Sequence, residues 1–231
     1  MSRLKNLALD RLDNARQQGL TIHVGSEPTV PTTLGVECLG FFDDETSPPR
    51  IHVASPDHHA EDIWSLTALH EYCHFLQWKE GSPLMDAINE NMRIKTKGQP
   101  TIIDNPSNLF DLWIDLKVSL TTKEVDRCLK AVINLEADCE SRVLKLLRTN
   151  RLHDVAEAYI AQANAYILSF YATAATRSWE RETPFTSPSI IEFCLKEIPS
   201  TVQTFQENWR DCPAIQAYSD LVIQTCYNRK E

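Results

Sequence analysis

The segment His-Glu-Tyr-Cys-His at residues 70–74 constrains this chain more than any other part of its sequence. The surrounding pattern predicts a helix over about 59–79, closed by the helix breakers Gly81 and Pro83. Apolar side chains such as Trp64 and Leu69 occupy almost every face of that helix, which indicates that it is buried. Two buried imidazoles and a buried carboxylate are costly unless a partner engages them. The segment therefore predicts a functional site in the protein interior.

The spacing of the two histidines is that of a metal site on one helix. His70 and His74 are four residues apart, so their side chains lie on the same helical face, one turn from each other. This arrangement suits two ligands of a tetrahedral Zn²⁺ ion. Glu71 is adjacent and can act as the general base that takes a proton from zinc-bound water. We therefore expect a zinc-dependent hydrolase.

A third metal ligand is expected on a later helix, predicted over 121–148. Its apolar residues form one stripe, and Glu136 lies in the middle of that stripe. A carboxylate there carries a large desolvation cost unless it is paired or bound to a metal. Glu136 is therefore the predicted third ligand. Glu140, one turn later and about 40° to one side, is an alternative ligand or an acceptor behind one.

Other positions remain open for the third ligand and for catalysis. Glu80 follows His74 by six residues, but the glycine that such a pattern needs is replaced by Gln77. Asp86 is another acidic candidate. A hydrolase also needs a donor to the oxyanion that forms when a carbonyl is attacked. The candidates for that donor are His153, Tyr159 and Tyr166.

The order of predicted elements indicates an α+β fold. A helix over 3–18 precedes β-like runs at 21–24, 35–42 and 50–54. The last two runs are expected to form a hairpin around the polar turn between them. We expect at most three strands, in a small antiparallel sheet packed on the helix that carries the motif. Residues 81–108 are expected to be irregular. The rest of the chain is predicted to form helices over 107–120, 121–148, 154–180, 188–198 and 213–227.

Two regions follow from this order. Residues 1–150 are expected to form the core that carries the site, and 151–231 a helical extension packed on it. The two regions together are expected to form one structural unit of 231 residues. The C-terminal half is thus largely α-helical.

The composition of the chain limits which binding partners and which compartment we expect for the protein. The net charge of −9 argues against a nucleic-acid surface, and no apolar run is long enough to span a bilayer. The N-terminus has no signal-peptide core, and seven scattered cysteines without a Cys-x-x-Cys pair indicate reduced, structural thiols. These features predict a cytoplasmic protein.

The motif at 70–74, followed by Leu135-Glu136-Ala137-Asp138 on a later helix, resembles the gluzincin type of zincin metallopeptidases. The element order looks most like the ImmA/IrrE-type cytoplasmic peptidases, over about residues 35–148. The resemblance implies that His70, His74 and Glu136 bind zinc and that Glu71 is the general base of peptide-bond cleavage. It also implies a peptide or protein substrate.

A second hypothesis is that the chain binds zinc but catalyses no reaction. The chain would then be a zinc-stabilised regulatory or protein-binding module on the same scaffold. Such a site has a closed fourth position. Cys73, Cys139 or Glu140 is a candidate to fill it.

Overall fold

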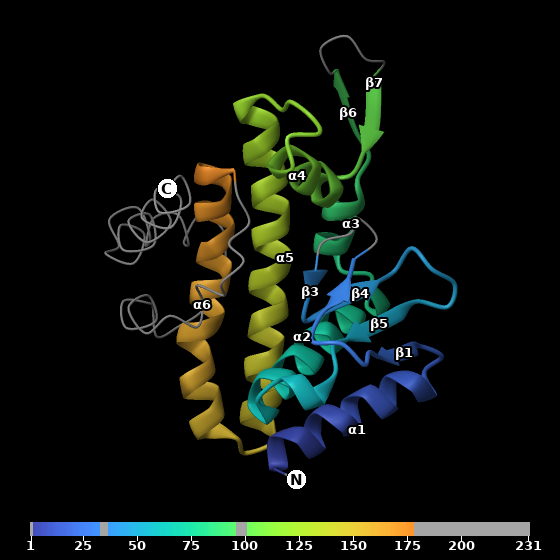
Figure 1. Ribbon diagram of the computed structural model, residues 1–231, viewed down its shortest axis with the longest axis vertical. Helices are drawn as coiled ribbons and strands as arrows, with labels where there is room; N and C mark the ends of the chain where they lie inside the picture. The colour runs from blue at the N-terminus through green and yellow to red at the C-terminus, as the bar shows by residue number, and fades with distance from the viewer. Residues whose placement is uncertain (1, 33–36, 96–100, 178–231) are drawn as a thin grey trace. The chain divides into compact units, whose positions relative to one another are not determined.

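The computed structural model describes residues 2–32, 37–95 and 101–177. Short strands are interspersed with helices up to residue 114, and long helices follow, so the fold is α+β with a helical C-terminal half, as predicted (Figure 1). The chain divides into two compact units. Of the described residues, the first unit combines those up to 82 with 139–153, and the second combines those of 83–138 with 154–177. The predicted division at residue 150 stays a prediction.

The first unit begins with helix α1, Arg3–Gln17, which matches the predicted helix over 3–18. The Ser2 hydroxyl accepts a hydrogen bond from the Lys5 backbone N–H and caps the helix. The apolar stripe predicted from the sequence is buried on one side of the helix. Gly19 follows with a φ of +91°, a left-handed conformation that glycine adopts without strain and that ends the helix.

A three-stranded sheet follows, made of β1 (Thr21–Val24), β4 (Gly40–Asp43) and β5 (Arg50–Val53) in the order β1-β5-β4. The predicted hairpin is confirmed, because β4 and β5 pair antiparallel. β1 pairs with β5 in parallel, so the sheet is mixed and not purely antiparallel. The strands β2 (Val30–Pro31) and β3 (Glu37–Cys38) lie between β1 and β4 and form a separate antiparallel pair.

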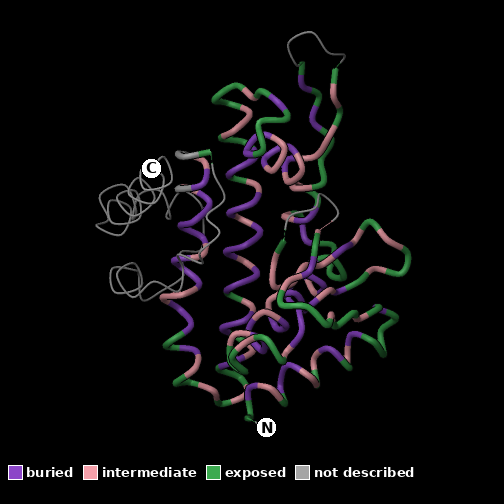
Figure 2. The backbone as a smooth tube through the Cα atoms, in the orientation of Figure 1, coloured by how far each residue is buried: buried purple, intermediate pink, exposed green. Residues whose placement is uncertain are grey.

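One face of the three-stranded sheet is buried against helix α2, Glu61–Lys79. Ile51 and Val53 on β5 are fully buried, while His52 between them is only half-buried. This alternation places the apolar side chains of β5 on the inner face of the sheet. α2 is the predicted motif helix. Its buried residues include consecutive positions from Trp64 to Leu66 and from Glu71 to Phe75, so they lie on more than one side of the helix. Figure 2 colours the backbone of the described residues by burial.

The turn before α2 is held by two histidines. Ala60 caps the helix without a side-chain hydrogen bond. His58 Nε2 lies 3.2 Å from the Ser26 carbonyl oxygen, and His59 Nε2 lies 2.6 Å from the Pro28 carbonyl oxygen. The two rings therefore fasten the loop after β1 to the start of the motif helix.

The second unit contains elements that the sequence analysis did not predict. Helix α3 (Pro83–Asn89) and a hairpin of β6 (Met92–Lys95) and β7 (Thr101–Asp104) occupy most of the region expected to be irregular. That expectation, and the limit of three strands, were wrong. Met92 and Ile94 are buried and their neighbours exposed, but this alternation is only four residues long. So short an alternation, close to a glycine and prolines that indicate turns, is not enough to predict a strand.

Three further helices complete the described residues. α4 (Pro106–Ile114) is shorter than predicted, and Leu116 follows it with a φ of +61°. α5 (Thr122–Thr149) and α6 (His153–Thr176) match the predicted helices over 121–148 and 154–180 closely. α5 contributes its first part to the second unit and its last part, from Cys139, to the first. The helices expected at 188–198 and 213–227 lie outside the described residues.

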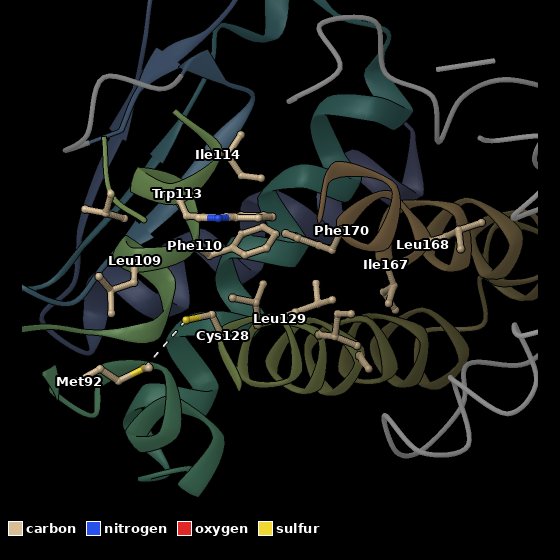
Figure 3. Close-up of a cluster of buried hydrophobic side chains, with 14 of the residues drawn as sticks. Met92, Leu109, Phe110, Trp113, Ile114, Cys128, Leu129, Ile167, Leu168 and Phe170 are labelled. Carbon is tan, nitrogen blue, oxygen red and sulfur yellow. Dashed lines mark hydrogen bonds between the residues drawn. The ribbon is translucent and has the colours of Figure 1, made fainter. Parts of the chain in front are cut away.

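The core of the second unit is an apolar cluster. The rings of Phe110, Trp113 and Phe170 meet on one side of it, and the Cys128 thiol lies 4.0 Å from the Met92 sulfur on another (Figure 3). Ile133 on α5 is fully buried in the same cluster. The apolar stripe read from the sequence of α5 thus faces a core over this part of the helix.

Two expectations from composition bear on the described residues. Cys38, Cys73, Cys128 and Cys139 are not joined in disulfides, which agrees with the prediction of reduced thiols for these four. Of the helices formed by the described residues, none combines the length and the apolar character needed to cross a bilayer.

Asp111 on α4 gives a testable pH dependence of stability. Burial, and then the negative charge of Asp115, raise its pKa from the ordinary value to about 7. The folded state therefore holds this proton more tightly than the unfolded state does, and the contribution of the group to stability falls as the pH rises from about 4 to about 7. Asp111→Asn should remove that loss, which is a few kcal/mol at most because each pKa unit corresponds to about 1.4 kcal/mol.

The measurement is urea unfolding of both proteins between pH 4 and pH 8. Asp111→Asn should gain stability over the wild type as the pH rises. Asp10→Asn, on the exposed side of α1, is the matched control and should follow the wild type at every pH. A constant difference between Asp111→Asn and the wild type across this range would contradict the prediction.

Candidate metal centre

Helix α2 brings the two motif histidines face to face. The rings of His70 and His74 lie nearly perpendicular, at 83°, with their centroids 4.6 Å apart. Their Nε2 atoms are 3.0 Å apart. His74 is buried, and the His70 side chain is 13% exposed. The one-turn spacing predicted from the sequence therefore makes both Nε2 atoms converge on one point.

Behind His70 lies a carboxylate from helix α5. Glu140 Oε1 is 3.1 Å from His70 Nδ1, and the Glu140 side chain is only 3% exposed. An ionised carboxylate accepts hydrogen bonds and does not donate them, so Nδ1 of His70 carries the proton. Glu140, which the sequence analysis weighed as a ligand or an acceptor, thus takes the position of the acceptor in this arrangement.

Behind His74 lies an amide that the sequence analysis did not identify. Gln77 is fully buried, and its Oε1 is 2.8 Å from His74 Nδ1. An amide oxygen also only accepts, so His74 carries its proton on Nδ1 as well. The sequence held a signal for this residue, because Gln77 is a polar side chain within an otherwise apolar buried helix, three residues after a histidine.

These two contacts determine what the Nε2 atoms can do. A neutral imidazole has one N–H, and a ring that donates it from Nδ1 to Glu140 or Gln77 carries a lone pair at Nε2. Two such lone pairs, on nitrogens 3.0 Å apart, can bind one metal ion. Two imidazole nitrogens on one tetrahedral Zn²⁺ are about 3.3 Å apart, since each Zn–N bond is about 2.0–2.1 Å. The pair therefore fits a metal ion of this kind.

Cys139 completes a group that could hold a metal ion. Ligand atoms of His70, His74 and Cys139 all lie within 4.8 Å of one another. Cys139 is fully buried on α5. Its sulfur is 3.6 Å from His70 Nδ1 and donates a hydrogen bond to the His70 carbonyl oxygen at 3.3 Å. The thiol is thus positioned on the Nδ1 side of the His70 ring.

Glu71 lies beside the histidines and faces strand β4. Glu71 is buried, at 5% exposure. A Cβ placed on Gly40 would be 3.1 Å from Glu71 Cγ, 2.9 Å from Thr67 Cγ2 and 3.0 Å from the His52 carbonyl oxygen. Burial and then the charge of Glu71 raise the pKa of the Cys38 thiol to about 12. The backbone of the edge strand therefore approaches the motif helix closely at the candidate base.

The other acidic candidates are placed as follows. Glu136 is buried on α5, one turn before Glu140, in the part of the helix that belongs to the second unit. Its role as a ligand stays a prediction. Glu80 is exposed, and one of its oxygens is 2.7 Å from Nη1 of Arg142, which occupies its carboxylate. Asp86 is exposed on α3.

The three candidates for an oxyanion donor lie on helix α6. His153 begins the helix and is exposed, whereas Tyr159 is buried. The ring of Tyr166 packs edge-on against Phe170 with the centroids 5.3 Å apart. Tyr166 therefore contributes to the packing of α6, and the identity of the donor stays open among the three.

Comparisons of the chain with models of known protein families, with curated proteins and with solved structures give no match.

The contact between Gly40 and the motif helix can be tested by one methyl group. Gly40→Ala should destabilise the protein by about 1–3 kcal/mol, because the added Cβ overlaps side chains of α2 and a carbonyl of β5. Gly25→Ala is the matched control, since its Cβ would come no closer than 3.4 Å to Val30. Urea unfolding of the three proteins decides, and equal loss in both variants would show that the strand is not tightly held against α2.

Proposed function

We propose that this protein is a zinc-dependent hydrolase that acts as a peptidase, with His70 and His74 as ligands and Glu71 as general base. The observation that carries the proposal is the pair of Nε2 atoms 3.0 Å apart, each turned toward the other by an acceptor on the opposite side of its ring. A histidine that binds a metal through one ring nitrogen usually donates a hydrogen bond from the other ring nitrogen. The resemblance to gluzincin metallopeptidases supports the same function.

The protein's own residues have defined tasks in this proposal. Glu140 and Gln77 hold the two imidazoles in the tautomer that leaves Nε2 available. Glu71, buried next to His70, accepts a proton from the attacking water and returns it to the leaving amine. A bound zinc ion would polarise the substrate carbonyl and acidify water near neutral pH.

The third ligand is proposed to be Glu136. Its carboxylate is buried on α5, as the sequence predicted for a ligand in the apolar stripe. Cys139 is the competing candidate, because its sulfur belongs to the group with both histidines. The thiol, however, already donates to the His70 carbonyl and lies on the Nδ1 side of that ring, away from the nitrogen that the metal needs. These contacts favour the carboxylate.

A second function follows if Cys139 is the ligand. A thiolate beside both histidines would favour a closed, structural zinc site and a regulatory or protein-binding role without cleavage. In either case we propose a peptide or protein as the partner, and the cytoplasm as the compartment. The chain's net charge of −9 does not favour nucleic acid.

Metal content by mass spectrometry tests the ligands. About one zinc per chain is expected in the wild type, and a large loss in His70→Ala, His74→Ala and Glu136→Ala. Cys139→Ser separates the two functions, because it should keep its zinc in the hydrolase and lose it in the thiolate site. His23→Ala, an exposed histidine on β1, is the control and should keep its zinc. A wild type without zinc would refute the proposal.

Turnover of a fluorogenic peptide library then tests the reaction. Glu71→Gln should retain zinc and lose at least about 100-fold in rate, since a positioned general base contributes roughly 10²–10⁴-fold. Asp62→Asn, an exposed acid in the first turn of the same helix, is the control and should remain active. Cleavage that survives Glu71→Gln would sink the mechanism, while a zinc-loaded wild type without any cleavage would favour the regulatory function.

A further inference from the structure

We infer that Gln77 is a positioning residue that fixes the tautomer of the metal ligand His74 and does so as a neutral acceptor. This inference rests on the metal site of the proposed function, but not on the hydrolytic step. Gln77 lies on the same helix as His74, three residues later, so its side chain reaches the ligand without help from another element. The contact is a hydrogen bond of 2.8 Å to His74 Nδ1.

The burial of Gln77 indicates that this contact has a purpose beyond packing. Gln77 is fully buried, as is Cys73 one turn earlier on the same helix. A buried amide is costly unless its polar atoms are engaged, and an apolar residue of similar size would fill the same space at no such cost. The hydrogen bond to His74 gives the amide a role that an apolar side chain cannot take.

The same contact controls which nitrogen of His74 meets the metal. With Nδ1–H donated to Gln77, the lone pair remains on Nε2, which is the atom that faces His70 Nε2. Without the acceptor, the proton is free to move to Nε2 and block that position. The ring is also free to turn about its bond to Cβ. Loss of the Gln77 carbonyl should therefore weaken metal binding even though Gln77 does not touch the metal.

The two histidines differ in the charge of their acceptors. His70 donates to the carboxylate of Glu140, whereas His74 donates to the uncharged amide of Gln77. A carboxylate raises the basicity of the imidazole that donates to it more than an amide does. Gln77→Glu should thus retain the tautomer and bind zinc at least as tightly as the wild type, while Gln77→Met removes the acceptor at nearly the same volume.

The experiment is a competition titration of zinc-free protein with Zn²⁺ and a chromophoric chelator. Gln77→Met should lower the affinity for Zn²⁺ about 10–100-fold, and Gln77→Glu should restore it to the wild-type value or above. Gln17→Met, exposed at the end of α1, is the matched control and should bind like the wild type. Urea unfolding of the zinc-free proteins runs in parallel, so that a loss of affinity is separated from a loss of fold.

The outcomes distinguish this inference from the proposed function. Unchanged zinc affinity in a folded Gln77→Met protein overturns the inference alone, and so does weak binding that Gln77→Glu fails to restore. A wild type that binds zinc but cleaves no peptide leaves the inference standing and overturns the hydrolase. A wild type that binds no zinc overturns both.

A measurement on the wild type covers the case in which Gln77→Met does not fold. Nitrogen-15 NMR of the zinc-loaded protein should show His74 protonated on Nδ1 and bound to the metal through Nε2. Metal on Nδ1 of His74, or a proton on its Nε2, would overturn the inference.

Discussion

The feature on which the rest of this structure depends is the meeting of two imidazole rings of one helix in the protein interior. His70 and His74 turn their Nε2 atoms to within 3.0 Å of each other, and hydrogen bonds on the far side of each ring hold them there. Together with Cys139, the two rings form a group that could hold a metal ion. The helix, the sheet behind it and the segment of α5 that carries Glu140 all serve to maintain this geometry.

The surroundings explain why the rings cannot simply turn away. α2 is buried on nearly all sides, with the inner face of the sheet against one of them. Interiors of this density allow few alternative rotamers. The absence of a side chain at Gly40 lets the backbone of β4 come close enough to Glu71 to limit its movement as well. Polar atoms at the site are therefore fixed by the packing of apolar ones around them.

The sequence predicted the parts of the fold that repeat a long pattern. α1 and α5 carry an apolar stripe over several turns, α2 and α6 carry apolar residues on most faces, and all four helices were found close to their predicted bounds. The β6–β7 hairpin and α3 were missed, because a pattern of four to seven residues between glycine and prolines carries little information. The parallel pairing of β1 with β5 was missed for another reason. Strand partners are chosen by contacts between distant segments, and local alternation does not record them.

The residues of the candidate site also differ in whether local sequence or distant contacts decide their positions. The spacing of His70 and His74 is a local property of one helix, and the sequence therefore predicted that they meet. The position of Glu140 behind His70 depends on how α5 is placed in the first unit, and the sequence left it as one of two roles. Gln77 was within reach of prediction, since it is on the same helix as His74. It was considered only as the position where a glycine was lacking, and its buried amide was overlooked.

The interleaving of the two units has a consequence for how the protein acquires its site. Residues 83–138 separate the motif helix from the segment with Glu140, yet both of those segments belong to the first unit. The contact between His70 and Glu140 spans 70 positions of the chain. Closing so long a loop costs entropy before any contact repays it, although that cost grows only slowly with further length. The site should thus be among the last features to assemble during folding.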